Sequence, residues 1–103
     1  MTDYLWRKGM IKFNLGQLVC TRTINEHFKN ETTKKEIFSA IDKYITCDWG
    51  NLCEEDKKMN EYAIKNNNDR ILAKYHIDSI NEDIYIITEW DRSYTTVMFC
   101  YEY

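Results

Sequence analysis

The last third of the chain alternates two sets of side chains with a period of two, and this pattern constrains the fold more than any other feature. The alternation runs through "RILAKYHID" (70–78), "DIYIITEW" (83–90) and "TTVMFCYEY" (95–103). Successive side chains of a β-strand point to opposite faces of a sheet, and β-branched and aromatic residues favour strands. The short polar segments between the runs predict an antiparallel three-strand meander, with its second turn at residues 91–94.

Two segments before the meander repeat their apolar residues with helical spacing. "ETTKKEIFSAIDKYIT" (31–46) places its isoleucines and aromatics on one helix face, and Thr33 with Glu36 fits a capping box at its start. "EEDKKMNEYAIKN" (54–66) predicts a second helix, whose three initial acids suit the positive end of the helix dipole. The residues expected on the buried stripe of this second helix are Leu52, Met59, Tyr62 and Ala63.

An earlier strand is predicted over residues 16–24, "GQLVCTRTI". The order strand, helix, helix and three strands predicts an α+β domain. Its sheet would be antiparallel, with three to four strands made by the C-terminal meander plus this N-terminal strand, and two helices would cover one face. The chain has 103 residues, no proline and no low-complexity linker, which suits one domain with one core.

The charge and the cysteines limit the classes of partner and site. A net charge of −3 lacks the basic surplus of a general nucleic-acid binder, so direct nucleic-acid contact is not expected. No apolar run is long enough for a membrane span and no signal-peptide pattern opens the chain, so we expect a cytoplasmic protein. Cys20, Cys47, Cys53 and Cys100 form no C-x-x-C pair and are predicted to be reduced thiols. The short spacing between Cys47 and Cys53 leaves a metal site open.

Enzyme motifs are absent from the sequence. The two histidines, His27 and His76, lie in no recognisable motif with a nucleophile, although a Cys–His pair could still meet in space. Neither a Walker loop, nor G-x-G-x-x-G, nor a zinc-deaminase signature occurs. Glu89 and Asp91 are two positions apart in a strand-like run, so both carboxylates could point to the same face as a catalytic pair. Solvated acids at the end of a hairpin commonly have the same spacing. We therefore predict a non-enzymatic protein without a cofactor.

Aromatic and arginine side chains are the candidates for an interaction surface. Buried aromatic anchors and arginines carry much of the binding energy of protein interfaces. A core tryptophan and a salt-bridged arginine would account for the same residue types. The candidates of this kind are Trp49, Trp90, Arg22, Arg70 and Arg92.

Four stretches have a specific combined pattern: "FNLGQLVCTR", "DWGNLCEEDKKMN", "IYIITEWDRSYTTVMF" and the final "YEY". Together they resemble a family of small proteins from plasmids, phages and integrated elements of Gram-positive bacteria. Its members are often labelled "type I restriction endonuclease subunit M" or "plasmid-related protein". The resemblance covers residues 10–103, the expected single domain, and leaves residues 1–9 as a variable N-terminal extension. Methyl transfer would need an N-P-P-F or D-P-P-Y type motif, and this chain has no proline.

The resemblance implies carriage on a mobile element, where small acidic proteins often disable host defences. The leading hypothesis is an anti-defence protein that binds a bacterial defence nuclease, with a CRISPR effector as first candidate, and masks its nucleic-acid-binding or catalytic surface. The alternatives are a small-molecule or nucleotide binder acting on a defence signal, and an accessory protein of plasmid biology. A homodimer is left open. The positions carried over as a candidate surface are Thr21, Arg22, Asp48, Trp49, Gly50, Arg70, Glu89, Asp91, Arg92, Ser93, Thr95 and Thr96.

Overall fold

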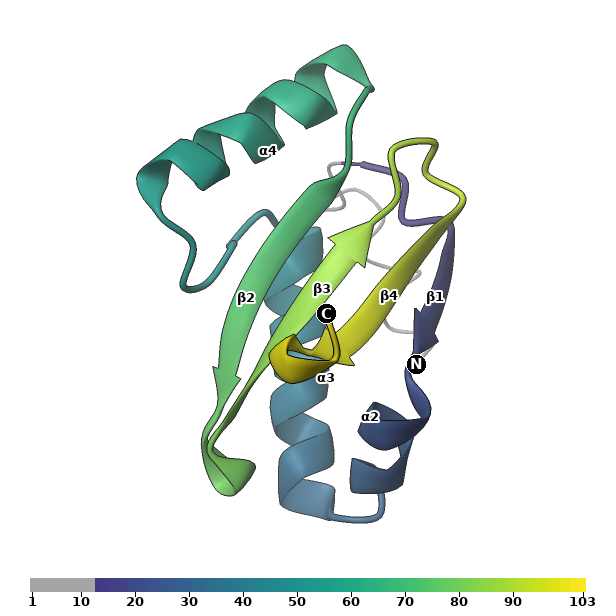
Figure 1. Cartoon of the computed structure of the whole chain (residues 1–103), viewed down its shortest axis with the longest axis vertical. Helices are drawn as coiled ribbons and strands as arrows, with labels where there is room; N and C mark the ends of the chain where they lie inside the picture. Colours follow the sequence, from purple (N-terminus) through teal and green to yellow (C-terminus); the bar gives the residue numbers. More distant parts are fainter. Residues whose placement is uncertain (1–12) are drawn as a thin grey trace.

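The computed structural model describes residues 13–103 and confirms the α+β class (Figure 1). The expected extension at residues 1–9 lies outside the described residues. One four-stranded sheet has the strand order β1-β4-β3-β2. The strands are β1 (Gln17–Cys20), β2 (Ile71–Ile77), β3 (Glu82–Thr88) and β4 (Tyr94–Phe99).

The C-terminal meander is confirmed, but the sheet is mixed and not wholly antiparallel. β2 pairs antiparallel with β3, and β3 with β4, whereas β1 pairs parallel with β4. The link between β3 and β4 spans residues 89–93, so it begins two residues before the predicted turn begins and ends one residue before that turn ends. The last strand is shorter than expected, because the chain turns at Phe99 into the 3-10 helix η3 (Cys100–Glu102).

Three α-helices accompany the sheet, namely α2 (Arg22–His27), α3 (Glu31–Ile45) and α4 (Glu54–Asn66). Helix α3 crosses one face of the sheet, while α4 projects beside the edge formed by β2 (Figure 1). Helix α2 was not predicted. The predicted strand over residues 16–24 is wrong after Cys20, because the Thr21 hydroxyl accepts the Ile24 N–H and begins a helix there.

The start of α3 also differs from the predicted capping box. Asn30, and not Thr33, is the N-cap, and its side-chain oxygen accepts the Thr33 N–H at 3.0 Å. Glu36 points instead to the Ser79 N–H in the 3-10 helix η2 (Asp78–Ile80). The carboxylate therefore ties α3 to the β2–β3 connection.

The core lies between α3 and the inward face of the sheet, and a chain of hydroxyl groups crosses it. The Tyr44 hydroxyl lies 2.7 Å from Thr88 Oγ1, which lies 2.7 Å from Thr95 Oγ1. Thr95 in turn donates to the main-chain oxygen of Leu15 at 2.7 Å. Thr88 and Thr95 can thus each accept one hydrogen bond and donate one, and Tyr44 can donate to Thr88, which satisfies these buried polar groups. Burial raises the pKa of Tyr44, so the ring stays neutral.

Two different sets of main-chain contacts cover the free edge of β2. The side chain of Asn60 on α4 donates to the Leu72 main-chain oxygen at 2.6 Å and accepts the Leu72 N–H at 3.1 Å. Further along the edge, Gly50 forms an isolated parallel bridge with Lys74. An open edge exposes unpaired amides and carbonyls to other chains, and these contacts remove that exposure over the middle of β2.

Replacing Asn60 with alanine is expected to lower the free energy of unfolding by about 2 kcal/mol, because both main-chain groups of Leu72 lose their partner. Asn60 is 4% exposed, so water does not freely replace the amide. Urea unfolding measures the loss. Asn66→Ala is the matched control, since that amide bonds only to Tyr62 O on the exposed face of α4. Equal, small losses for both variants would contradict the edge-capping role.

Candidate functional site

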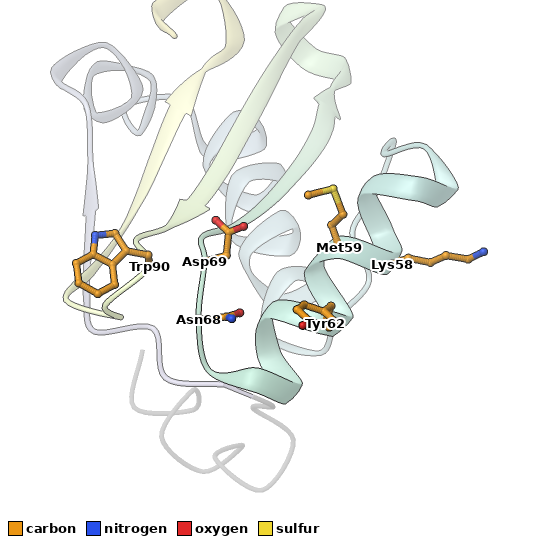
Figure 2. A pocket seen from close by; sticks show the side chains of 6 residues that line it. All are labelled: Lys58, Met59, Tyr62, Asn68, Asp69 and Trp90. Carbon is orange, nitrogen blue, oxygen red and sulfur yellow. The ribbon is translucent and has the colours of Figure 1, made fainter.

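A groove lies between α4 and the link that joins β3 to β4 (Figure 2). Its volume is about 560 Å³. One wall comes from α4, the other from the β3–β4 link, and the segment between α4 and β2 lies between them. The lining residues are Lys58, Met59, Tyr62, Asn68, Asp69 and Trp90.

Three large apolar side chains around this groove are turned to solvent. The exposed fractions are 61% for Met59, 64% for Tyr62 and 66% for Trp90. The predicted burial of Met59 and Tyr62 is wrong, because α4 stands beside the sheet and packs through Asn60 and Ala63 instead. Single exposed apolar residues are ordinary, but a group of them around one hollow is typical of an interaction site.

A second, smaller hollow of about 230 Å³ continues the groove toward β2. It shares Met59 and Asp69 with the groove, so the two hollows are contiguous. Its other lining residues are Asp56, Asn60, Arg70 and Leu72. The groove proper is mainly apolar, whereas this continuation brings two carboxylates and one guanidinium together.

Arg92 holds both walls of the groove in place. Its guanidinium donates to Ala63 O at 3.0 Å, Asn68 O at 3.2 Å and Asp69 O at 2.6 Å, all at the end of α4 or just after it. It also donates to the main-chain oxygens of Glu89 and Trp90, each at 3.1 Å, in the β3–β4 link. The forked guanidinium has five N–H donors, which suits several carbonyls at fixed positions.

Arg92 is therefore a clamp inside the molecule and not a surface anchor. Only 8% of the residue is exposed. Its backbone has a φ of +60°, a left-handed conformation that non-glycine residues seldom adopt. The C-terminal end of α4 carries the negative pole of the helix dipole, which attracts a cation. We infer that the arginine in "WDRS" positions the groove instead of contacting a partner.

Two further sequence candidates are also part of the interior. Trp49 is 3% exposed, packs against Tyr44 with ring centroids 5.6 Å apart, and donates its indole N–H to Glu61 at 3.1 Å. Thr95 is fully buried in the hydroxyl chain of the core. These two residues stabilise the fold and are not presented to a partner.

The remaining candidates of the β3–β4 link have different surroundings. Trp90 lines the groove, and Figure 2 shows its indole across from the side chains on α4. The Asp91 carboxylate accepts the Ser93 N–H at 3.0 Å and the Ser93 hydroxyl at 2.6 Å. The hydroxyl contact lowers the pKa of Asp91. Asp91 and Ser93 thus form the turn, while Glu89 is half-buried and binds Arg92 through its main chain.

The candidates outside this link are spread over several elements. Arg70 lines the second hollow, but its guanidinium donates to the Tyr103 hydroxyl and lies over that ring, 5.6 Å from the centroid. Asp48 accepts the Gly50 N–H at 3.2 Å. Arg22 is exposed in the first turn of α2, and Thr96 is half-buried on β4. Thr21 caps α2 and donates to Glu102 at 2.9 Å.

The groove residues that the sequence interpretation missed come from α4 and the segment after it. Lys58, Met59 and Tyr62 stand on one helix face, and Asn68 and Asp69 follow it. A signal for them was present, since an amphipathic helix with methionine and tyrosine at i and i+3 can serve either a core or a partner. The helical period alone does not distinguish a face buried in the core from a face that contacts a partner.

The sequence left open a metal site at Cys47 and Cys53, and residues 13–103 show no cluster of metal ligands. That part of the chain holds no group of three or more histidine, cysteine, aspartate or glutamate side chains placed to bind a metal ion. Burial raises the pKa of Cys20 and Cys100, which favours their neutral thiols over thiolates.

None of the helices in the described part has the length and hydrophobicity of a membrane-spanning segment.

His76 forms a small charged cluster at the opposite end of β2 from the groove. Its Nδ1 lies 2.7 Å from Asp83 Oδ1 and its Nε2 lies 3.5 Å from Asp78 Oδ1. The hydrogen bond to Asp83 raises the pKa of the imidazole above its ordinary value of 6.5. Among residues 13–103 the ring has no hydroxyl or thiol partner, and its contacts are those of an ion pair between β2, β3 and η2.

The raised pKa predicts a pH-dependent contribution of His76 to stability. The protonated ring is favoured in the folded chain, so its contribution is fully present below the ordinary pKa of 6.5 and is lost as the pH rises through the raised value. Urea midpoints of the wild type and His76→Gln should therefore differ more at about pH 5.5 than at about pH 8.5. The effect is small because the side chain is exposed, and an equal difference at both pH values would contradict it.

Comparisons with family models, with curated proteins and with solved structures give no match to this chain.

Proposed function

We propose that this chain is a non-enzymatic binding protein that contacts another protein through the groove between α4 and the β3–β4 link. The observation that carries the proposal is the group of exposed apolar side chains, Met59, Tyr62 and Trp90, around one hollow. Tryptophan and tyrosine are enriched among the residues that dominate binding energy at protein interfaces. The Arg92 clamp fixes both walls beforehand, which lowers the entropic cost of ordering them on binding.

The geometry supports a protein partner better than a small ligand. A small-molecule site normally buries most of its ligand, whereas here three of the lining side chains are more than half exposed. Among the candidate positions, the residues suited to hold a small ligand at one sheet edge are Arg22, Arg92 and the Thr95–Thr96 pair. Arg92 and Thr95 are instead occupied inside the molecule. These residues therefore supply no common pocket.

The proposed partner is a bacterial defence nuclease, with a CRISPR effector as the leading candidate. The resemblance of the chain to mobile-element proteins supports this choice, as does its net charge of −3. An acidic protein is attracted to the basic channel in which a nuclease holds nucleic acid, and this attraction speeds association. Inhibition would follow from masking that channel or the catalytic surface.

The proposal is tested by titrating the purified full chain into a panel of defence nuclease complexes and measuring DNA cleavage. The expected result is stoichiometric loss of cleavage by at least one complex, together with a stable complex on size-exclusion chromatography. Because the attraction is partly electrostatic, association should slow as salt rises. Full cleavage and no binding across CRISPR and restriction nucleases would overturn the nuclease assignment.

A further inference from the structure

The apolar groove and the acidic hollow beside it form one two-part surface. They share Met59 and Asp69, so a single bound segment can contact both. The apolar part is bounded by Tyr62 and Trp90, and the acidic part contains Asp56 and Asp69. The change from apolar to acidic along one surface restricts the chemistry of what can bind it.

Asp69 stands at the junction of the two parts and is held rigidly. Its main-chain oxygen accepts from Arg92 at 2.6 Å, and its Oδ1 accepts the Arg70 N–H at 2.8 Å. The residue has a φ of +55°, a conformation that aspartate and asparagine tolerate better than most residues. Its carboxylate therefore has a fixed direction, which Figure 2 shows between Trp90 and Met59.

Two carboxylates and one guanidinium line the second hollow, which leaves one negative charge in excess there. No ion pair within residues 13–103 involves Asp56 or Asp69. Arg70 lines the same hollow, but its guanidinium is engaged with the ring and hydroxyl of Tyr103. Lys58 lines the groove, yet its side chain extends away from Asp69 (Figure 2). A cation supplied by a partner would form an ion pair with these carboxylates.

We infer that the two-part surface binds a partner segment carrying an apolar side chain next to a lysine or arginine. The apolar side chain packs against Met59, Tyr62 and Trp90, and the basic group pairs with Asp69 and Asp56. This inference rests on the proposed function in so far as the occupant is a protein. It adds the chemistry of the contact, and it fits a basic nucleic-acid channel, where lysine and arginine are abundant.

The test is selection of a random-peptide library, displayed on phage, against the immobilised full chain. Selected peptides are expected to share an apolar residue adjacent to lysine or arginine. Trp90→Ala should weaken the best synthetic peptide by about tenfold or more, as for an interface anchor. Asp69→Asn should weaken it about two- to fivefold, as for one exposed ion pair.

The charge variant is matched in shape and in position. Asparagine at position 69 keeps the left-handed backbone and the acceptor for the Arg70 N–H, so the fold is preserved. Glu55→Gln removes an exposed acid from the same helix region without touching either hollow, and should leave peptide affinity unchanged. A circular-dichroism melt of each variant checks that folding is intact.

Four outcomes would overturn the inference: no enrichment, enriched peptides without a basic residue, peptides insensitive to Asp69→Asn, or self-association of the chain that Trp90→Ala abolishes. The last would mean that a second copy fills the groove. Nuclease inhibition that needs Trp90 without basic peptides would leave the proposed function standing and remove this inference. Selection of basic peptides without inhibition of any nuclease would leave this inference standing and remove the nuclease assignment.

Discussion

Replacing Gly50 with alanine is expected to lower the free energy of unfolding by about 4 kcal/mol, a loss that only a few kinds of single substitution produce. Gly50 has a φ of +69°, where an L side chain is strained. An added Cβ would lie 2.2 Å from the Lys74 main-chain oxygen and 2.7 Å from the Tyr75 ring. Backbone strain and a clash with backbone thus act together. Urea denaturation followed by circular dichroism measures the loss.

The Gly50 substitution would also release the segment that covers the edge of β2. Asn51 donates its N–H to Lys74 O at 2.8 Å, and the Tyr75 hydroxyl donates to Asp48 O at 2.7 Å. The control is Asn51→Ala, which keeps that main-chain contact and is expected to cost less than about 0.5 kcal/mol. If Gly50→Ala were as mild as this control, the close approach of Gly50 to β2 would be refuted.

Replacing Arg92 with alanine is expected to lower the free energy of unfolding by about 3 kcal/mol, since a guanidinium that serves five carbonyl oxygens is lost. The end of α4 and the β3–β4 link would then no longer be joined. The measurement is again urea unfolding, with hydrogen exchange of the α4 amides as a local readout. We expect faster exchange at the end of α4 than in the meander.

Two control variants separate the causes of the Arg92 effect. Arg92→Lys keeps the charge but not the planar fork, and should recover only a minor part of the loss. Arg92→Gly relieves the backbone strain at a φ of +60°, and should be about 1 kcal/mol more stable than Arg92→Ala. A lysine variant as stable as the wild type would show that charge alone suffices, contrary to the clamp.

The sheet could be predicted because its signal is local. In β2 and β3 the inward residues alternate with outward ones, as at Ile71, Ala73 and Ile84, and in β4 the same holds for Val97 and Phe99. Buried and exposed residues alternate along these strands because one face of the sheet packs against α3. The parallel pairing of β1 with β4 joins residues far apart in the chain, and four residues of sequence carry no sign of that direction.

The site could be predicted only in part, because the deciding contacts are long-range. Arg92 lies in a polar turn by sequence, and its burial depends on carbonyls at the end of α4, more than twenty residues earlier, as the contact to Asn68 shows. Met59 and Tyr62 have a helical period that fits a core equally well. Their exposure follows from where α4 stands, and that position is set by Asn60 and Arg92. Trp90 is the one sequence candidate that lines the apolar groove.

The most direct test of the proposed binding surface compares two exposed aromatic residues in the inhibition of any nuclease that the titration shows the chain to bind. Trp90 is 66% exposed at the groove, and Tyr101 is 64% exposed in η3, beyond the opposite end of β4. Trp90→Ala is predicted to raise the inhibitor concentration for half-maximal cleavage by about tenfold or more, while Tyr101→Ala leaves it within about twofold. Equal potency of both variants and the wild type would contradict the claim that the groove between α4 and the β3–β4 link is the binding surface.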